Sequence, residues 1–170
     1  MRTSIRLAML LVLVGMLGAA PATRPSLKLT DKQILAGYDV PLKASQTREG
    51  TPRRNGTIKE KDGSRVQIAI IGPEGQPVMI QLPAMTLVPG AFEGNAGTLT
   101  AAQTIFCNVV DVENEQAQFK RFVRDLMDAM KRQDQEVTRE FGDVRAVLEG
   151  MPQADGSAID VTLTLTRKPG

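Results

Sequence analysis

Apolar and polar residues alternate along the last part of the chain. In the segment 158–167, "AIDVTLTLTR", the residues Ile159, Val161, Leu163 and Leu165 are apolar and those between them are polar. A period of two places the two sets on opposite faces of a β-strand. We therefore predict a strand with one buried and one solvated face, as in an antiparallel sheet. With residues 143–149 it is predicted to form a hairpin over 143–166.

The same period marks earlier strands. Residues 58–61 and 65–71 flank the dipeptide Asp62-Gly63, which is a strong hairpin signal. Further strands are predicted over 77–82 and 85–88. The segment 98–112 is predicted to form one long strand or two short ones. We therefore expect the strands of an antiparallel meander over 57–112.

Between these strand regions the period changes to three or four residues. The apolar stripe consists of Phe119, Phe122, Val123, Leu126, Met127, Met130, Val137 and Phe141. This spacing predicts one amphipathic helix over about 114–141, ended by Gly142. The stripe lapses at Gln133-Asp134, where the helix would bend or project. It has two interpretations, a cover for the sheet or a face that binds a partner or a lipid.

The segment 23–56 is the hardest to interpret. Thr30 and Gln33 fit a capping box that opens a short helix, whereas Leu27 and Leu29 alternate like a strand. Residues 43–56, "KASQTREGTPRRNG", are polar and punctuated by Gly and Pro, which predicts a loop or flexible arm. We therefore treat 23–56 as an irregular N-terminal arm beside a single domain over 57–170.

The fold class that follows is α+β. It is an antiparallel sheet of roughly five to seven strands, covered by one long amphipathic helix near the C-terminal end. A sheet with one apolar face needs such a cover.

The first 22 residues have the layout of a secretory signal peptide. Arg2 and Arg6 precede an apolar run over 7–17, and the small residues Ala20-Pro21-Ala22 follow. The run is shorter than the roughly 18–20 residues that cross a bilayer. We predict cleavage between Ala22 and Thr23, with an uncleaved anchor as the alternative. The mature chain then has no transmembrane segment and is expected in the periplasm or outside the cell.

Removal of residues 1–22 takes away two arginines and no acid, which leaves 19 basic and 19 acidic side chains. The charges are unevenly spread, because residues 23–66 carry ten basic and five acidic side chains and residues 67–119 carry no basic one. No aromatic residue stands among the basic residues Arg48, Arg53, Arg54, Lys59 and Lys61, and the chain has no Trp and one Tyr. Single-stranded nucleic acids need stacking platforms of that kind, so nucleic-acid binding is not expected.

The chain has no histidine, which excludes Ser-His and Cys-His nucleophile pairs and histidine metal sites. Asp111, Glu113 and Glu115 form the densest acidic cluster. They have three interpretations: a weak site for a hard cation, the carboxylates of a hydrolase, or acids that favour a helix N-terminus. Cys107 is the only cysteine and sits in "TIFCNVV", so it is predicted to be a buried core thiol with a raised pKa, with an intermolecular disulfide as the alternative.

These observations favour a non-catalytic secreted or periplasmic protein. It would bind a partner protein or an apolar ligand between helix and sheet, with no cofactor and no resident metal. The alternatives are a carboxylate-based hydrolase, or a self-associating structural subunit of the cell envelope in which 134–141 docks on another copy.

Overall fold

The computed structural model describes residues 25–88 and 95–168. Within them the chain forms a seven-stranded antiparallel sheet and helices, so the predicted α+β class is confirmed. The prediction of one long covering helix is wrong, because three helices occur in the described residues. The predicted signal peptide over 1–22 and its cleavage site lie outside them.

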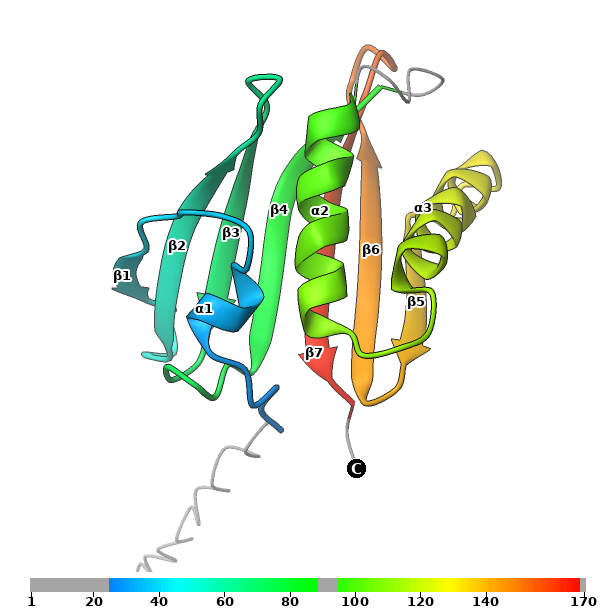
Figure 1. Cartoon of the computed structure of the whole chain (residues 1–170). Coiled ribbons are helices and arrows are strands. Elements are labelled where there is room, and N and C mark those ends of the chain that lie inside the picture. Colours follow the sequence, from blue (N-terminus) through cyan, green and yellow to red (C-terminus); the bar gives the residue numbers. More distant parts are fainter. Residues whose placement is uncertain (1–24, 89–94, 169–170) are drawn as a thin grey trace, which may run out of the picture.

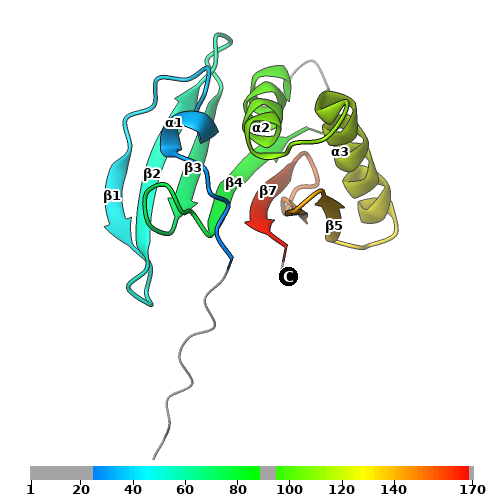
Figure 2. The same cartoon turned by 60° about the horizontal axis from the view of Figure 1, so that its bottom comes forward.

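In the described part of the chain, four strands precede a central pair of helices and three strands follow it. In chain order, the elements are α1 (Asp31–Ile34), β1 (Lys43–Gln46), β2 (Pro52–Lys59), β3 (Arg65–Ile71), β4 (Met79–Leu87), α2 (Ala96–Val109), α3 (Glu115–Lys131), β5 (Glu136–Phe141), β6 (Val144–Pro152) and β7 (Ile159–Arg167). The strand order in the sheet is β1-β2-β3-β4-β7-β6-β5, so β4 pairs with the last strand of the chain. All three helices lie on the same face of the sheet (Figures 1 and 2).

The N-terminal arm is more ordered than its composition predicts. Thr30 and Gln33 form the predicted capping box at the start of α1. The segment 43–56, predicted to be a loop, instead contributes β1 and the first half of β2. All four residues of β1 are exposed, so the backbone pairing with β2 holds this strand in place and burial contributes little. A hydrophobic pattern cannot reveal such an edge strand.

The hairpin between β2 and β3 turns at Asp62-Gly63, where Gly63 has a φ of 88° that suits glycine. The two strands predicted over 77–82 and 85–88 are one strand, β4. Its pairing with β7 shifts between Leu82 and Met85, and Ala84 there has a φ of 51°. A β-bulge of this kind turns Met85 back toward the core.

The largest difference between the sequence-based expectation and the structure concerns residues 98–112, for which the pattern predicts strand. They lie mostly in α2, whose buried residues are Gly97, Ala101, Ala102, Ile105, Phe106 and Val109. These residues recur at helical spacing and several are small, so the helix packs closely on the sheet. β-branched Thr and Ile favour strands locally, but the uncovered apolar face of the sheet outweighs that preference.

The predicted helix over 114–141 is also wrong in its second half. α3 ends at Lys131, and after Gln133, with a φ of 70°, the chain continues as β5. Val137 and Phe141 therefore belong to a strand, where residues two apart share a face. They also fit a helical spacing counted from Met130, which is why the pattern is misleading.

The two faces of the sheet differ sharply. The covered face, which carries Ile159, Val161, Leu163 and Leu165 of β7, packs against the helices, and these four residues are buried. The helix-free face carries Asp160, Thr162, Thr164 and Thr166 of β7 and their neighbours on the other strands. It is mostly polar, as the alternation in the sequence predicts.

Candidate functional site

The residues of the predicted binding stripe form part of the hydrophobic core. Phe119, Phe122, Val123, Leu126 and Phe141 are buried, whereas Met127, Met130 and Val137 are half-buried against the same cluster. Six of the eight lie on α3, and the other two come from β5. Most of the stripe therefore covers the sheet, and only its edge is left at the surface.

Three aromatic contacts hold the end of the core where α2, α3 and β5 meet. The Phe106 ring of α2 lies 5.3 Å from Phe119 and 4.9 Å from Phe141, centroid to centroid. Phe122 lies 5.6 Å from Phe141. The two pairs with Phe141 are edge-to-face, and pairs of that kind stabilise by about 0.5–1.5 kcal/mol beyond the area they bury. They fix the position of α3 relative to α2.

The predicted acidic cluster lies between α2 and α3 and at the start of α3. Asp111 and Glu113 are exposed, whereas Glu115 is half-buried and is the first residue of α3. In residues 25–88 and 95–168, no group of three or more Cys, Asp or Glu side chains could hold a metal ion. Glu115 suits the positive end of the α3 dipole.

Cys107 on α2 is a free thiol, half-buried against the core. Desolvation, followed by the nearby carboxylate of Glu115, raises the pKa of the Cys107 thiol above its usual value. The direction matches the expectation from its apolar neighbours. A thiol with a raised pKa is a poor nucleophile near neutral pH.

A small groove lies between α2 and α3 and has a volume of about 190 Å³. Its lining consists of Leu99 and Gln103 from α2 and Phe119, Lys120, Val123 and Arg124 from α3. Phe119 and Val123 are buried at its floor, and Lys120 and Arg124 are exposed at its rim. The groove therefore has an apolar floor and a rim of positive charge.

The positive charge at this rim is only partly balanced by the acids of α3, since Lys131 and, more weakly, Arg124 lower the pKa of Asp128, and Arg124 forms no ion pair with it. Asp125 pairs with Arg139 of β5, and Asp128 pairs with Lys131 at 2.8 Å. Among the ion pairs of the described residues, none includes Lys120 or Arg124. A negatively charged group outside this chain would therefore be attracted to the groove.

Two larger hollows lie beside the N-terminal arm, with volumes of about 480 and 590 Å³. Both are lined by Tyr38, whose hydroxyl donates a hydrogen bond to Glu60 Oε1 at 2.5 Å. Burial, together with this bond to Glu60, raises the pKa of Tyr38 to about 12. The hydroxyl therefore stays protonated at neutral pH and offers no acid–base chemistry there.

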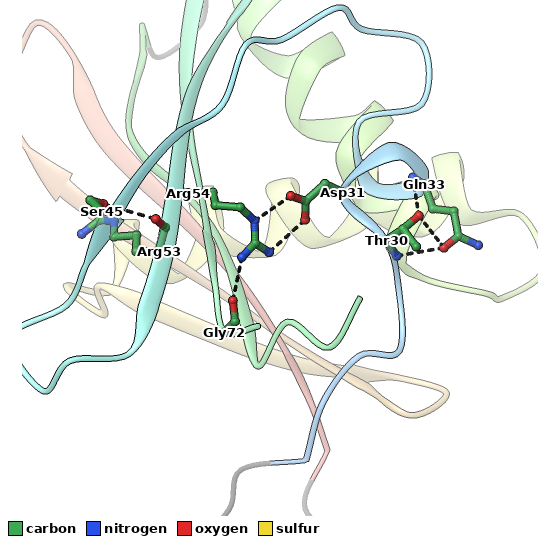
Figure 3. A network of polar contacts seen from close by, with 7 residues as sticks. All are labelled: Thr30, Asp31, Gln33, Ser45, Arg53, Arg54 and Gly72. Atoms are coloured by element: carbon green, nitrogen blue, oxygen red, sulfur yellow. Dashed lines mark hydrogen bonds and ion pairs between the residues drawn. The ribbon is translucent and has the colours of Figure 1, made fainter. Parts of the chain in front are cut away.

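The polar contacts beside these hollows hold the arm in place (Figure 3). Arg54 of β2 donates to both carboxylate oxygens of Asp31, at 2.6 and 2.9 Å, and to the carbonyl of Gly72 at 2.7 Å. All three nitrogens of this guanidinium have an acceptor of this chain, so the network is structural. The Arg54 guanidinium therefore holds the fold together and is not a free charge for a ligand.

Sequence reasoning missed the groove because it did not predict α2. A signal was present, since Ala101, Ile105 and Val109 recur every four residues. Lys120 and Arg124 are also four residues apart, which places them on one side of a helix.

Within residues 25–88 and 95–168, no helix is long and apolar enough to cross a membrane. A comparison with known proteins finds no matching protein family, no matching curated protein and no matching solved structure.

Proposed function

We propose that the protein is a non-catalytic, exported binding protein that receives an acidic amphipathic helix of a partner protein in the groove between α2 and α3. The observation that carries the proposal is the apolar floor of Phe119 and Val123 between the exposed cations Lys120 and Arg124. An apolar side chain of the partner would fill the groove while its carboxylates meet the rim. This is the helix-in-groove mode of recognition.

The size of the groove favours a partner side chain over a free apolar ligand. Pockets for drug-sized molecules measure about 300–1,000 Å³, and this groove measures about 190 Å³. A ligand between helix and sheet would have to displace side chains such as Phe122 and Leu126, which are fully buried there. A protein partner needs no such opening of the core.

The rim charges supply selectivity for an acidic partner. Complementary charges at an interface speed association and disfavour partners of the wrong sign more than they add affinity. A basic helix would meet Lys120 and Arg124 with like charge, and an uncharged one would gain nothing from them. Export by the segment 1–22 would place the encounter in the periplasm or outside the cell.

The proposal can be tested with a photo-crosslinking amino acid at position 103, inside the groove, in cells of the natural host. We expect a discrete adduct with one protein, absent when the crosslinker stands at position 48, which is exposed in the turn between β1 and β2. The double variant Lys120→Glu with Arg124→Glu should abolish the adduct. Adducts that form equally from both positions, or that survive the double variant, would contradict the proposal.

A second test uses purified components and needs no knowledge of the partner. A synthetic amphipathic peptide helix with Glu on its polar face is titrated against the protein, beside a matched peptide with Lys at those positions. We expect only the acidic peptide to bind, and Lys120→Glu with Arg124→Glu to weaken it about tenfold or more. The control is Arg145→Glu, which also removes a surface cation but lies on the helix-free face.

A further inference from the structure

The helix-free face carries two pairs of like charges that stand directly opposite each other on neighbouring strands. Lys59 of β2 is the register partner of Arg65 of β3, and Glu136 of β5 is the partner of Glu149 of β6. All four side chains are exposed. Like charges in directly opposed positions of an antiparallel pair destabilise it. The fold therefore carries two unfavourable pairs of opposite sign on one face.

The two pairs do not neutralise each other within one chain. Four strand spacings separate their midpoints in the order β1-β2-β3-β4-β7-β6-β5, which is roughly 19 Å at about 4.8 Å per strand. The Debye length at physiological salt is about 8 Å. None of the four residues takes part in an ion pair within the described part of the chain.

The charge is segregated over the whole helix-free face. The positions that β2 and β3 contribute to it include Arg53, Lys59 and Arg65 and no acid. The β7, β6 and β5 end carries Asp160, Glu149, Glu136 and Glu140, and the cations beside them are Arg145, which faces Glu140, and Lys168, which pairs with Glu140. Between the two ends lie neutral residues of β4 and its neighbours, among them Met79, Gln81 and Thr164.

The acidic end is hollowed, with a volume of about 320 Å³. The hollow is lined by Gln135, Glu136, Glu149, Gly150, Met151, Asp160 and Thr162. Met151 is 67% exposed, one of the two large apolar side chains that are most exposed in the described residues. The hollow thus offers carboxylates and a flexible apolar side chain, which suit the long aliphatic stems and charged heads of Lys and Arg.

From this arrangement we infer that the helix-free face is a self-complementary dimer interface, on which a second copy of this chain packs. The two-fold axis runs parallel to the strands, between the two packed sheets and above the gap between β4 and β7. It places the β2–β3 side of one sheet over the β6–β5 side of the other. The registers then place the Lys59–Arg65 pair of one copy over the acidic hollow with Glu136 and Glu149 of the other, and Arg53 over Glu140. Each such contact occurs twice, as in any isologous interface.

The position of the pairs along the strands supports the same axis. Lys59 ends β2 and Arg65 begins β3, while Glu136 begins β5 and Glu149 lies near the end of β6. In this antiparallel sheet all four positions lie toward the same end of the strands. A rotation about an axis along the strands leaves the position along the strands unchanged. The basic pair of one copy therefore meets the acidic pair of the other.

Pairing through the edge strand β5 is less favourable than pairing through the face. An antiparallel β5–β5 contact centred on Thr138 would set Glu136 opposite Glu140 twice. The expectation that 134–141 docks on another copy is therefore better met by the face that β5 helps to form than by its edge.

The area sets the expected strength of the dimer. The axis between β4 and β7 overlays six strands of each copy and leaves β1 outside the contact. Six strands, each about 4.8 Å wide, with rows of about six residues at 3.3 Å, span roughly 29 by 20 Å, or about 600 Å² per copy. The total of about 1,200 Å² lies at the lower limit of specific interfaces. We therefore expect a dimer that dissociates on dilution and in high salt.

The test is sedimentation velocity of the purified protein over a range of concentrations at low and high salt. The wild type should form a dimer whose dissociation constant rises about tenfold or more in high salt. Lys59→Glu with Arg65→Glu should give a monomer, and so should Glu136→Lys with Glu149→Lys. An equimolar mixture of the two variants should form a heterodimer, because both of its contacts are again complementary. Circular dichroism checks that each variant is folded.

The matched control is Lys120→Glu with Arg124→Glu, which makes the same charge change on α3 and should leave the dimer intact. A wild type that stays monomeric at low salt up to about 100 µM would overturn the inference, since standard interfaces associate well below that range. A dimer that survives both helix-free-face variants, or variants that fail to pair when mixed, would also overturn it.

Discussion

The two faces of the sheet obey different rules although they are made by the same strands. On β7, Leu163 and Leu165 are fully buried under the helices, whereas Thr162 and Thr164 between them are half-exposed. The covered face holds charges in pairs, such as Arg54 with Asp31 and Arg139 with Asp125. The helix-free face instead opposes Lys59 to Arg65 and Glu136 to Glu149. The covered face therefore stabilises the fold, whereas the charges opposed on the helix-free face do not.

The largest effect is expected for removal of a core side chain on the covered side. Phe122→Ala deletes a fully buried ring that contacts Phe141, and should lower the free energy of unfolding by about 3–5 kcal/mol. Urea unfolding followed by circular dichroism measures it. Arg121→Ala, one residue earlier and exposed, should change stability by less than about 0.5 kcal/mol. If both variants lost the same free energy of unfolding, the assignment of a buried and an exposed side to α3 would be contradicted.

The next effect concerns the paired charges of the covered face. Asp31→Ala leaves the Arg54 guanidinium, whose side chain is 14% exposed, without its carboxylate and should cost about 2 kcal/mol. The matched control is Asp128→Ala, which breaks the exposed pair with Lys131 and should cost less than about 1 kcal/mol. Thermal or urea unfolding of both variants decides. An Asp31 variant as stable as the Asp128 variant would mean that the arm is not held by this network.

The N-terminal arm beside the covered face supplies a pH-dependent effect. Burial and the bond to Glu60 raise the pKa of Tyr38 from 10.0 to about 12 in the folded protein. The neutral phenol is therefore the form that folding favours. Its contribution is fully present below about pH 10 and is lost as the pH rises toward about 12. The stability of the wild type should fall over this window.

Tyr38→Phe removes the titrating group and should flatten that decline relative to the wild type. Unfolding measured at several values of pH between about 9 and 12, and ultraviolet titration of the phenol, provide the two readings. The chain has a single tyrosine, so the absorbance change reports this residue alone. A phenol that ionises near its ordinary pKa in the folded protein would show that the hydroxyl is open to solvent.

The smallest effect has the opposite sign and lies on the helix-free face. Glu136→Lys converts a like-charge pair across β5 and β6 into an opposite-charge pair, and should raise stability by about 0.5 kcal/mol. Glu140→Lys makes the same change further along β5, where Glu140 faces Arg145 and pairs with Lys168. It should lower stability by a similar amount. Unfolding is measured at a dilution where the protein is monomeric, and effects of the same sign would contradict the pairing.

Sequence reasoning succeeded where a local rule and the tertiary fold agree. The alternation in β7, the Asp62-Gly63 turn and the capping box at Thr30 are each specified within a few residues. The apolar stripe of α3 is likewise a local pattern, and its burial follows from the need to cover one face of the sheet.

Sequence reasoning failed where neighbours distant in the chain decide. Residues 96–109 have the Thr and Ile content of a strand, yet they form α2. This helix covers the apolar face of the sheet at β4 and β7. Val137 and Phe141 keep a helical spacing from Met130, yet they lie in β5 because β6 offers a backbone partner for the whole segment. The groove at Lys120 and Arg124 is formed by α2 and α3 together. The sequence therefore predicted only its α3 side, as the edge of the apolar stripe.

The sequence by itself therefore determined the α+β class, the antiparallel strands and the faces on which apolar residues lie, because a period of two or 3.6 depends only on the backbone. Tertiary structure alone decided the number of helices, the strand order and the register. Register sets Lys59 opposite Arg65 and Glu136 opposite Glu149, although six and thirteen positions separate these partners along the chain. Charge opposition across strands is a property of pairing, and pairing is settled by the burial of the whole covered face.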